Sequence, residues 1–312
     1  MRTILIALLA FLGSCSLSPR VLAWGPSGHM LVAAIAYQQL TDADRAAVEK
    51  MLEGHTNYLG WLHSFNTHSP GVPQSAWVFM QAAVWPDVIR DYEVPATRAN
   101  QHFVDFPLRP PKYSTNMAQP NPNDNVISGI HACEGIVSHG HSNPRKMAES
   151  VSFLIHFIGD IHQPLHCSTL FNESFPPPVG DRGGTLFYFK TNEMDPGNTL
   201  HGLWDRLLNK ETQAKPILQE ANELIAAFPR SQFGPGVIDK TVLQWAKESR
   251  DLSREYGYKP LPRLDAKQHH AVMLPPQYIA NATEIARKRA ALAGYRLAEH
   301  LRDLLAAHGE PP

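Results

Sequence analysis

The sequence lacks the excess of basic residues that is typical of proteins binding nucleic acid through charge alone. Its 28 Lys and Arg residues are balanced by 29 Asp and Glu residues, so the formal net charge is −1. A protein of this charge that handles phosphate groups needs another source of positive charge, and metal ions can supply it. The 16 histidines raise the expectation of a metal site without locating it, because imidazole is the commonest metal ligand.

Long apolar segments are also missing beyond the N-terminus, so no later segment is expected to span a membrane. The N-terminus carries Arg2, a short apolar run over residues 4–12, and Val21-Leu22-Ala23, which fits the small-x-small rule for signal cleavage. We therefore expect residues 1–23 to be a cleaved signal peptide and the protein to be secreted or periplasmic, with Trp24 as its first residue. Without that peptide the chain keeps 26 basic and 29 acidic residues, a charge of −3.

Two alternatives exist for this N-terminal segment. One is a membrane anchor that stays attached. The other is lipid attachment at Cys15, because residues 12–15 resemble a lipobox. Lipid attachment would leave Trp24 inside the chain, with its nitrogen in a peptide bond.

Cysteines are few, and only Cys133 and Cys167 remain once Cys15 is removed with the signal. Export permits a disulfide bond between them. Two buried thiols are an equally good interpretation.

Strand signals are scarce, and helical periodicity dominates the chain. Only residues 185–190 have the composition of a short strand. No repeat, linker or low-complexity tail divides the sequence, so we expect a mainly α, single domain over residues 24–312. The expected helices cover residues 28–40, 42–53 (with Thr41 as N-cap), 143–163, 200–209, 214–228, 237–256 and 276–307.

His156 and Asp160 are the first candidates for chemistry, because a spacing of four places them on one face of the long helix 143–163. Their neighbours are apolar, so both side chains need a partner. The partner could be each other, or a metal ion that both bind. His166 follows just beyond the helix as a third possible ligand, whereas His162 points elsewhere and is expected behind the site or at the surface.

The same spacing recurs in His201 and Asp205, within another expected helix. Two such pairs on apolar helices indicate a metal site enclosed by helices. Upstream, Asp87 follows Trp85-Pro86, where a helix cap or turn is the commoner role, and His102 is unremarkable alone. His29 lies five residues after Trp24, whose free amine could also bind zinc.

These segments together resemble the trinuclear-zinc, single-strand-specific nucleases and 3′-nucleotidases of fungi, plants and bacteria. The most specific of them is HFIGDIHQPLH over residues 156–166. The supporting segments are WGPSGH (24–29), AAVWPD (82–87), HFVDF (102–106), GGT (183–185) and LHGLWD (200–205). The resemblance implies a zinc phospholipase C/nuclease-like helical bundle with long loops and at most a small β-hairpin.

The resemblance also implies three zinc ions and their ligands. Asp87, His102, His156 and Asp160 would hold the first ion, and His166, His201 and Asp205 the second. The amine and carbonyl of Trp24, with His29 and Asp160, would hold the third. Asp160 would then bridge two ions.

The implied reaction is hydrolysis of single-stranded DNA and RNA, and of 3′-nucleotides, to 5′-phosphate products by a hydroxide shared between bridged ions. Asp87, Arg90 and Asp160 would be catalytic, with Arg90 contacting the phosphate. Phe103 would stack on an unpaired base and Asp105 would accept from its N–H groups. Thr185 replaces the Asn that many members have, which puts substrate preference in doubt.

Two other functions compete with this interpretation. A zinc-dependent phospholipase C would share the fold and the N-terminal Trp, but the HFVD segment and Asp205 favour the nuclease. A non-catalytic zinc-binding protein would need closed coordination and no Arg90 or aromatic pocket. Asp160 as an expected bridging ligand argues against it, because bridged ions are usually catalytic. We expect a monomer without stable membrane association, acting on single-stranded nucleic acid or nucleotides.

Overall fold

The computed structural model describes residues 24–69, 71–90, 96–110, 119–140, 142–208, 211–234 and 241–309. The expected signal peptide, residues 1–23, lies outside these residues. None of the described helices combines the length and the apolar composition needed to cross a membrane.

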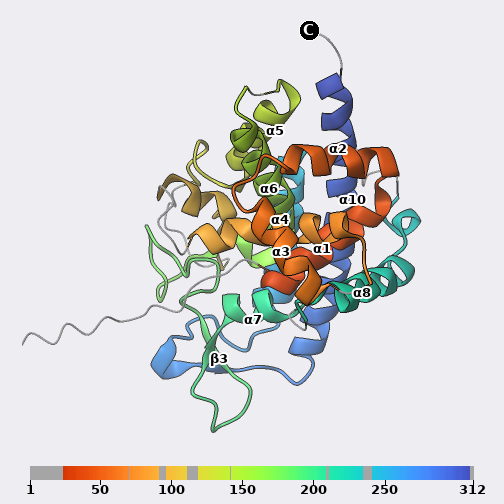
Figure 1. The fold of residues 1–312 in the computed structure, drawn as a ribbon. Helices are drawn as coiled ribbons and strands as arrows, with labels where there is room; N and C mark the ends of the chain where they lie inside the picture. Colours follow the sequence, from red (N-terminus) through yellow and green to blue (C-terminus); the bar gives the residue numbers. More distant parts are fainter. Residues whose placement is uncertain are drawn as a thin grey trace, which may run out of the picture.

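Ten α-helices dominate the described residues (Figure 1). They are α1 (Pro26–Gln39), α2 (Asp42–Leu52), α3 (Tyr58–His68), α4 (Gln74–Arg90), α5 (Val126–Ser138), α6 (Pro144–Asp160), α7 (Leu200–Arg206), α8 (Ala214–Ala227), α9 (Val242–Leu252) and α10 (Tyr278–Gly309). Short 3-10 turns cover Ala96–His102, Pro164–Cys167, Arg230–Phe233 and Gln268–His270, and a π-helical turn, Ser253–Tyr258, continues α9.

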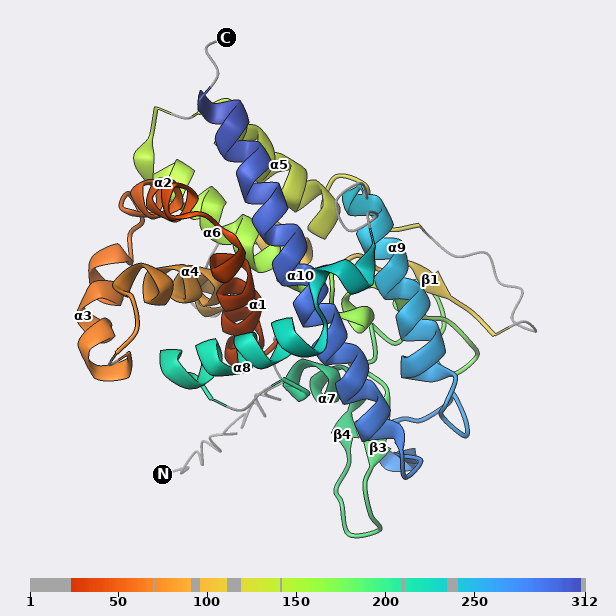
Figure 2. The ribbon, with the colours of Figure 1, turned by 90° about the vertical axis from the view of Figure 1, so that its right-hand side faces the viewer.

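Helix α1 lies at the centre because its sequence is apolar on every side. Its residues from Ser27 to Tyr37 are all buried, as expected for a helix without a polar face. It packs against α10, α4 and α8, whereas α6 packs against α5, α4 and α2. Figure 2 shows α10 running the length of the molecule, with α1 and α8 on one side and α9 on the other.

The strands are short and form two small sheets. Strands β1 (Pro107–Leu108) and β2 (Thr169–Leu170) pair in parallel. Strand β3 (Tyr188–Lys190) pairs antiparallel with β4 (Asn198–Thr199) and parallel with β5 (Val272–Met273). The β3–β4 hairpin projects from one end of the molecule (Figure 2).

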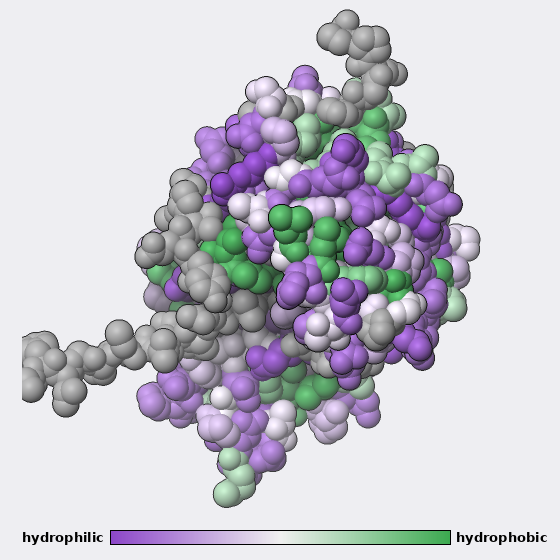
Figure 3. Space-filling view, in the orientation of Figure 1, coloured by the Kyte–Doolittle hydropathy of each residue, from purple (hydrophilic) through white to green (hydrophobic). Residues whose placement is uncertain are grey.

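Two apolar clusters form the interior. The larger includes α1, α4, α6 and α10, and the smaller surrounds α7 and the small sheets. Helix α6 therefore belongs to one cluster and α7 to the other, and the chain just after α6 contacts both, with Ile161 in the first and Leu165 in the second. The outer surface seen in Figure 3 is mostly hydrophilic, with apolar residues in separate patches.

The mainly α fold predicted from the sequence is confirmed, and each predicted helix has a counterpart close to its expected bounds. Thr41 caps α2 with a capping box, as expected. The predicted limit of one β-hairpin is wrong, because parallel pairs join segments far apart in the chain. Helices α3, α4 and α5 were not predicted.

The two cysteines of the described chain are free and buried, so the disulfide that export would permit is not formed. Cys167 donates to the carbonyl of Ile161 over 3.4 Å. Burial raises the pKa of Cys133 to about 11 and raises that of Cys167 still further, so both remain thiols. They are part of the larger apolar cluster.

Gly294 provides a test of the contact between α1 and α10. A Cβ atom at this position would lie 2.5 Å from Ile35 Cβ and 3.1 Å from the carbonyl oxygen of Val32. We expect Gly294→Ala to lower the free energy of unfolding by about 1–3 kcal/mol, because the core would be overpacked. Urea denaturation measures this change.

Gly60, on exposed α3, is the matched control, because nothing lies within 4 Å of its added Cβ. Gly60→Ala should raise the free energy of unfolding by roughly 0.5–1 kcal/mol through helix propensity. If Gly294→Ala stabilised the protein as Gly60→Ala does, the close packing of α1 on α10 would be contradicted.

Candidate metal centre

The end of α6 carries the pair that the sequence singled out. His156 and Asp160 lie four residues apart, and both are 0% exposed. Apolar side chains such as Phe153 and Phe157 surround them on the same helix. His156 Nε2 lies 3.1 Å from Asp160 Oδ2, so the two side chains contact each other. Because burial of unpaired polar groups is costly, their remaining polar atoms need partners from other segments.

Pro86 explains how α4 supplies one of these segments. A proline inside a helix has no N–H for the carbonyl four residues earlier, so the carbonyl of Ala82 is open to another donor. Ser152 of α6 donates its hydroxyl to this carbonyl over 2.5 Å. His156 Nδ1 donates to the next carbonyl, that of Ala83, over 2.7 Å. Asp87 thus lies inside the last turn of α4, not in the turn or cap that its context suggested.

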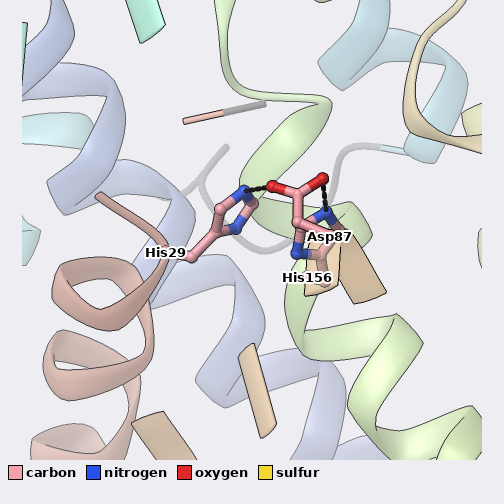
Figure 4. Close-up of side chains that lie close together, drawn as sticks. All are labelled: His29, Asp87 and His156. Carbon is pink, nitrogen blue, oxygen red and sulfur yellow. Dashed lines mark ion pairs between the residues drawn. The ribbon is translucent and has the colours of Figure 1, made fainter. Parts of the chain in front are cut away.

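Four side chains from other positions meet around Asp160. Its Oδ2 lies 3.0 Å from His102 Nδ1 and 3.1 Å from His156 Nε2, and its Oδ1 lies 3.4 Å from His29 Nε2. Asp87 Oδ1 is 3.8 Å from His102 Nδ1 and from His156 Nε2. In Figure 4, dashed lines join the Asp87 carboxylate to His29 of α1 and to His156 of α6, and its Oδ2 lies 4.0 Å from His29 Nε2.

A second group adjoins the first. Asp205 Oδ1 lies 3.5 Å from His166 Nε2, and its Oδ2 lies 3.4 Å from His201 Nε2. His166 comes from the 3-10 turn after α6, whereas His201 and Asp205 share one face of α7. His166 Nδ1 is 3.6 Å from Asp160 Oδ1, so the two groups are neighbours.

Backbone carbonyls orient three of the imidazoles. In each case Nδ1 donates outward, which leaves Nε2 facing the carboxylates. The pairs are His156 with Ala83 at 2.7 Å, His166 with His102 at 2.9 Å, and His201 with Gly183 at 2.7 Å. Such outer hydrogen bonds fix the tautomer and the ring direction of metal-binding histidines.

The segment from Trp24 to His29 is anchored beside both groups. Trp24 is buried and donates its indole N–H to the carbonyl of Gly159 over 3.0 Å. The N–H of Gly25 donates to the backbone carbonyl of Asp205 over 2.9 Å. A Cβ at Gly159 would lie 3.0 Å from His29 Nδ1, so the residue before Asp160 must be small.

Burial sets the charges of this cluster. It disfavours the imidazolium form and lowers the pKa of both His29 and His102 to about 4, which leaves them neutral and able to bind a metal. Burial also opposes the charged form of His156, but attraction by Asp160 and Asp87 outweighs it and raises the pKa. The nearby imidazoles overcome burial at Asp160 and hold the pKa of its carboxyl well below its usual range.

The polar atoms of the cluster are incompletely satisfied by the described residues. Six of them are buried without a hydrogen bond to any described group: His29 Nδ1 and Nε2, Asp87 Oδ1, Asp160 Oδ1, His166 Nε2 and His201 Nε2. Buried polar atoms normally have a partner, and a bound ion would provide one. Nitrogen and oxygen donors without thiolate suit catalytic zinc.

Three sets of side chains bring their donor atoms within 4.8 Å of one another. They are His29, Asp87 and His156; His102, His156 and Asp160; and His166, His201 and Asp205. The structure therefore brings together all eight side chains that the sequence nominated as ligands. Their individual ligand roles stay a prediction.

The residues nominated for substrate binding lie at the edge of the cluster. Arg90, in the last turn of α4, places a guanidinium nitrogen 3.7 Å from Asp87 Oδ1, and its side chain is 22% exposed. Phe103 and Asp105 line a cavity of 190 Å³ together with residues of the segment that precedes α5, among them Asp124. Asp105 accepts a hydrogen bond from the Thr169 hydroxyl, and burial raises its pKa.

The Gly183-Gly184 turn holds His201. Both glycines have left-handed backbones, with φ of 61° and 85°, which favours glycine. The carbonyl of Gly183 accepts from His201 Nδ1, and the carbonyl of Gly184 accepts from the His201 N–H over 3.2 Å. Thr185 follows in the same turn and donates its N–H to the carbonyl of Arg182 over 3.2 Å.

Two neighbours of the ligand positions differ from expectation. His162 is completely buried and contacts Arg296 at 2.9 Å, so the surface alternative is wrong. Gln163 was not singled out, yet its Nε2 donates to Asp205 Oδ1 over 2.7 Å. Its position in the sequence between two expected ligands, Asp160 and His166, could have indicated a role near the site.

A larger cavity, of 600 Å³, lies elsewhere, between α9 and α10. Its buried Arg289 and Arg296 already donate to Glu248, and none of the nominated ligands lines it. The candidate site is therefore identified by its cluster of His and Asp ligand atoms, and not by the size of a cavity.

Comparison with known proteins identifies the family of this chain. Residues 24–306 match the family described as S1/P1 nuclease. Endonuclease 3 of Arabidopsis thaliana is 26% identical over 308 residues, which cover 92% of this chain and 90% of that protein. Endonuclease 1 of the same plant is 26% identical over 317 residues, covering 95% and 91%. Because the family match extends over most of its length, the chain belongs to the S1/P1 nuclease family.

Proposed function

We propose that this nuclease is an exported, zinc-dependent phosphodiesterase that hydrolyses single-stranded DNA and RNA, and 3′-nucleotides, to 5′-phosphate products. The observation that carries the proposal is the buried cluster of eight His and Asp side chains around Asp160 and Asp205. Family membership supports a metal-dependent nuclease acting on nucleic acid.

We assign the cluster to three zinc ions. Asp87, His102, His156 and Asp160 would hold one ion, and His166, His201 and Asp205 another. Trp24, through its amine and carbonyl, would hold the third with His29 and Asp160. The closeness of His29 to Asp160 Oδ1, at 3.4 Å, supports this last grouping.

Bound zinc would supply Lewis acidity, which neutralises phosphate charge and activates water near neutral pH. The protein residues would supply orientation. The carboxylates of Asp87 and Asp160 would compensate the charge of the ions. The outward hydrogen bonds of His156, His166 and His201 prevent their rings from turning.

Arg90 would bind the phosphate. Its guanidinium is partly exposed and lies beside Asp87, so one face can contact solvent or substrate. A fixed guanidinium stabilises the charge that develops on phosphate oxygens during displacement. The net charge of −1 is consistent with this arrangement, since local cations would replace a broad basic surface.

Phe103 and Asp105 would hold one base. Phe103, which lines their cavity of 190 Å³, directly follows His102 in the chain, so a base bound there would place its phosphate near the cluster. Stacking on an aromatic ring is worth roughly 1–3 kcal/mol per base and tolerates any sequence. A base in this cavity must leave its duplex, which explains a preference for single strands.

Export has its own support. The family match begins at Trp24, the residue expected to follow signal cleavage. Trp24 is buried against Gly159, beside Asp160, where a free amine could reach the cluster. A secreted or periplasmic location follows from this proposal.

The test is a single preparation that begins at Trp24, with its zinc content measured. Single-stranded DNA, RNA, 3′-AMP and phosphatidylcholine are offered in parallel, with and without a chelator. We expect about three zincs per chain and cleavage of the nucleic acids, lost with chelator and restored by zinc. Cleavage of lipid alone would move the function to a phospholipase C, and zinc without cleavage would indicate a non-catalytic zinc-binding protein.

Asp160→Asn tests the bridging role. The substitution keeps the size of the side chain but removes the charge at the centre of the cluster, so zinc content and nuclease activity should fall together. Metal analysis and hydrolysis of single-stranded DNA measure both. Asp42→Asn, at a 98% exposed position, is the control and should change neither. Full activity in Asp160→Asn would remove the bridging role.

An additional residue before Trp24 tests the role of the free amine. We expect the extended protein to lose one zinc and to slow at least about tenfold, because the nitrogen would be locked in a peptide bond. The control is the same protein after proteolytic removal of the extension. Unchanged zinc content and rate in the extended form would refute this role.

A further inference from the structure

Gln163 is completely buried, and its side chain contacts one of the nominated ligands although it is not one itself. Its Nε2 donates to Asp205 Oδ1 over 2.7 Å, across 42 residues of sequence. Its Oε1 accepts the N–H of Leu165 over 2.6 Å. Both halves of the amide are therefore engaged.

These two contacts fix the direction of the amide. A backbone N–H can only donate, so the atom facing Leu165 must be the amide oxygen. An ionised carboxylate can only accept, so the atom facing Asp205 must be the amide nitrogen. The reversed amide would lose both hydrogen bonds and leave buried groups unpaired.

The backbone of Gln163 connects two further ligands. Its N–H donates to the carbonyl of Asp160 over 2.9 Å, and its carbonyl accepts the N–H of His166 over 3.1 Å. One residue thus ties the end of α6 to the turn that carries His166, and ties both to Asp205 on α7.

We infer that Gln163 is a positioning residue, which sets the orientation of the Asp205 carboxylate in the group formed with His166 and His201. The inference rests on the proposed function, because it gives this group a zinc ion to hold. With Oδ1 held by the amide, the carboxylate plane is fixed and Oδ2 faces His201 Nε2 at 3.4 Å. Without the amide donor, rotation of the carboxylate would weaken that site, since outer partners of ligands typically contribute 10–100-fold to metal affinity or activity.

The effect should extend toward the N-terminus. The backbone carbonyl of Asp205 accepts the N–H of Gly25, the residue after Trp24. Asp205 therefore links Gln163, through two hydrogen bonds, to the N-terminal segment that would bind the third ion. Its main effect is nevertheless expected at the Asp205 group, which its side chain contacts directly.

Two substitutions separate the functions of the amide. Gln163→Glu keeps an acceptor for the Leu165 N–H but removes the donor to Asp205 and adds a like charge. Gln163→Met has similar length and removes both the acceptor and the donor. A positioning role predicts that both variants lose about 10–100-fold in affinity for one zinc ion while the remaining zinc is retained. A role confined to anchoring the turn predicts a loss only in Gln163→Met.

Zinc affinity is measured by titrating metal-free protein in competition with a chromophoric chelator, and far-UV circular dichroism of the metal-free forms checks that they are folded. Gln38→Glu, at a partly buried amide that donates to the carbonyl of Leu218 over 3.4 Å, is the matched control and should bind zinc as the wild type does. Wild-type affinity for every zinc ion in Gln163→Glu would overturn the inference. A wild-type protein that binds fewer than two zincs would overturn both the inference and the proposed function.

Discussion

The carboxylate of Asp160 is completely buried, and its burial imposes the constraint on which the rest of the site depends. An ionised carboxylate away from water needs positive charge or several hydrogen bonds. The three imidazoles within 3.4 Å do not all bring charge, because burial keeps His29 and His102 neutral. Bound cations would resolve this deficit, and they would also give partners to the six buried atoms that the described residues leave without a hydrogen bond.

The scaffold satisfies this constraint by bringing together segments that are distant in sequence. Pro86 frees the carbonyl that Ser152 binds, and this contact brings Asp87 of α4 beside His156 of α6. Around Gln163 the chain contacts both apolar clusters, since Ile161 belongs to the larger and Leu165 to the smaller, and the second group is assembled there. The site lies at this boundary, with Trp24 packed against the end of α6.

The spacing of residues along the sequence predicted which side chains share one helix face. It predicted few of the contacts between separate segments. His156 with Asp160, and His201 with Asp205, share helix faces because four residues make about one turn. Asp87 was harder to place, because Pro86 suggests a helix end, whereas here α4 continues and α6 binds the released carbonyl. The parallel pairing of β1 with β2 and the contact of Gln163 with Asp205 join distant segments, and no periodicity in a single sequence reveals such pairs.

The most direct measurement is X-ray diffraction from crystals of the zinc-loaded protein beginning at Trp24, with data collected on both sides of the zinc absorption edge. We expect three anomalous peaks. One should lie among Asp87, His102, His156 and Asp160, one among His166, His201 and Asp205, and one between His29 and the amine of Trp24. Crystals that contain zinc but show no peak among the eight buried side chains would contradict the account.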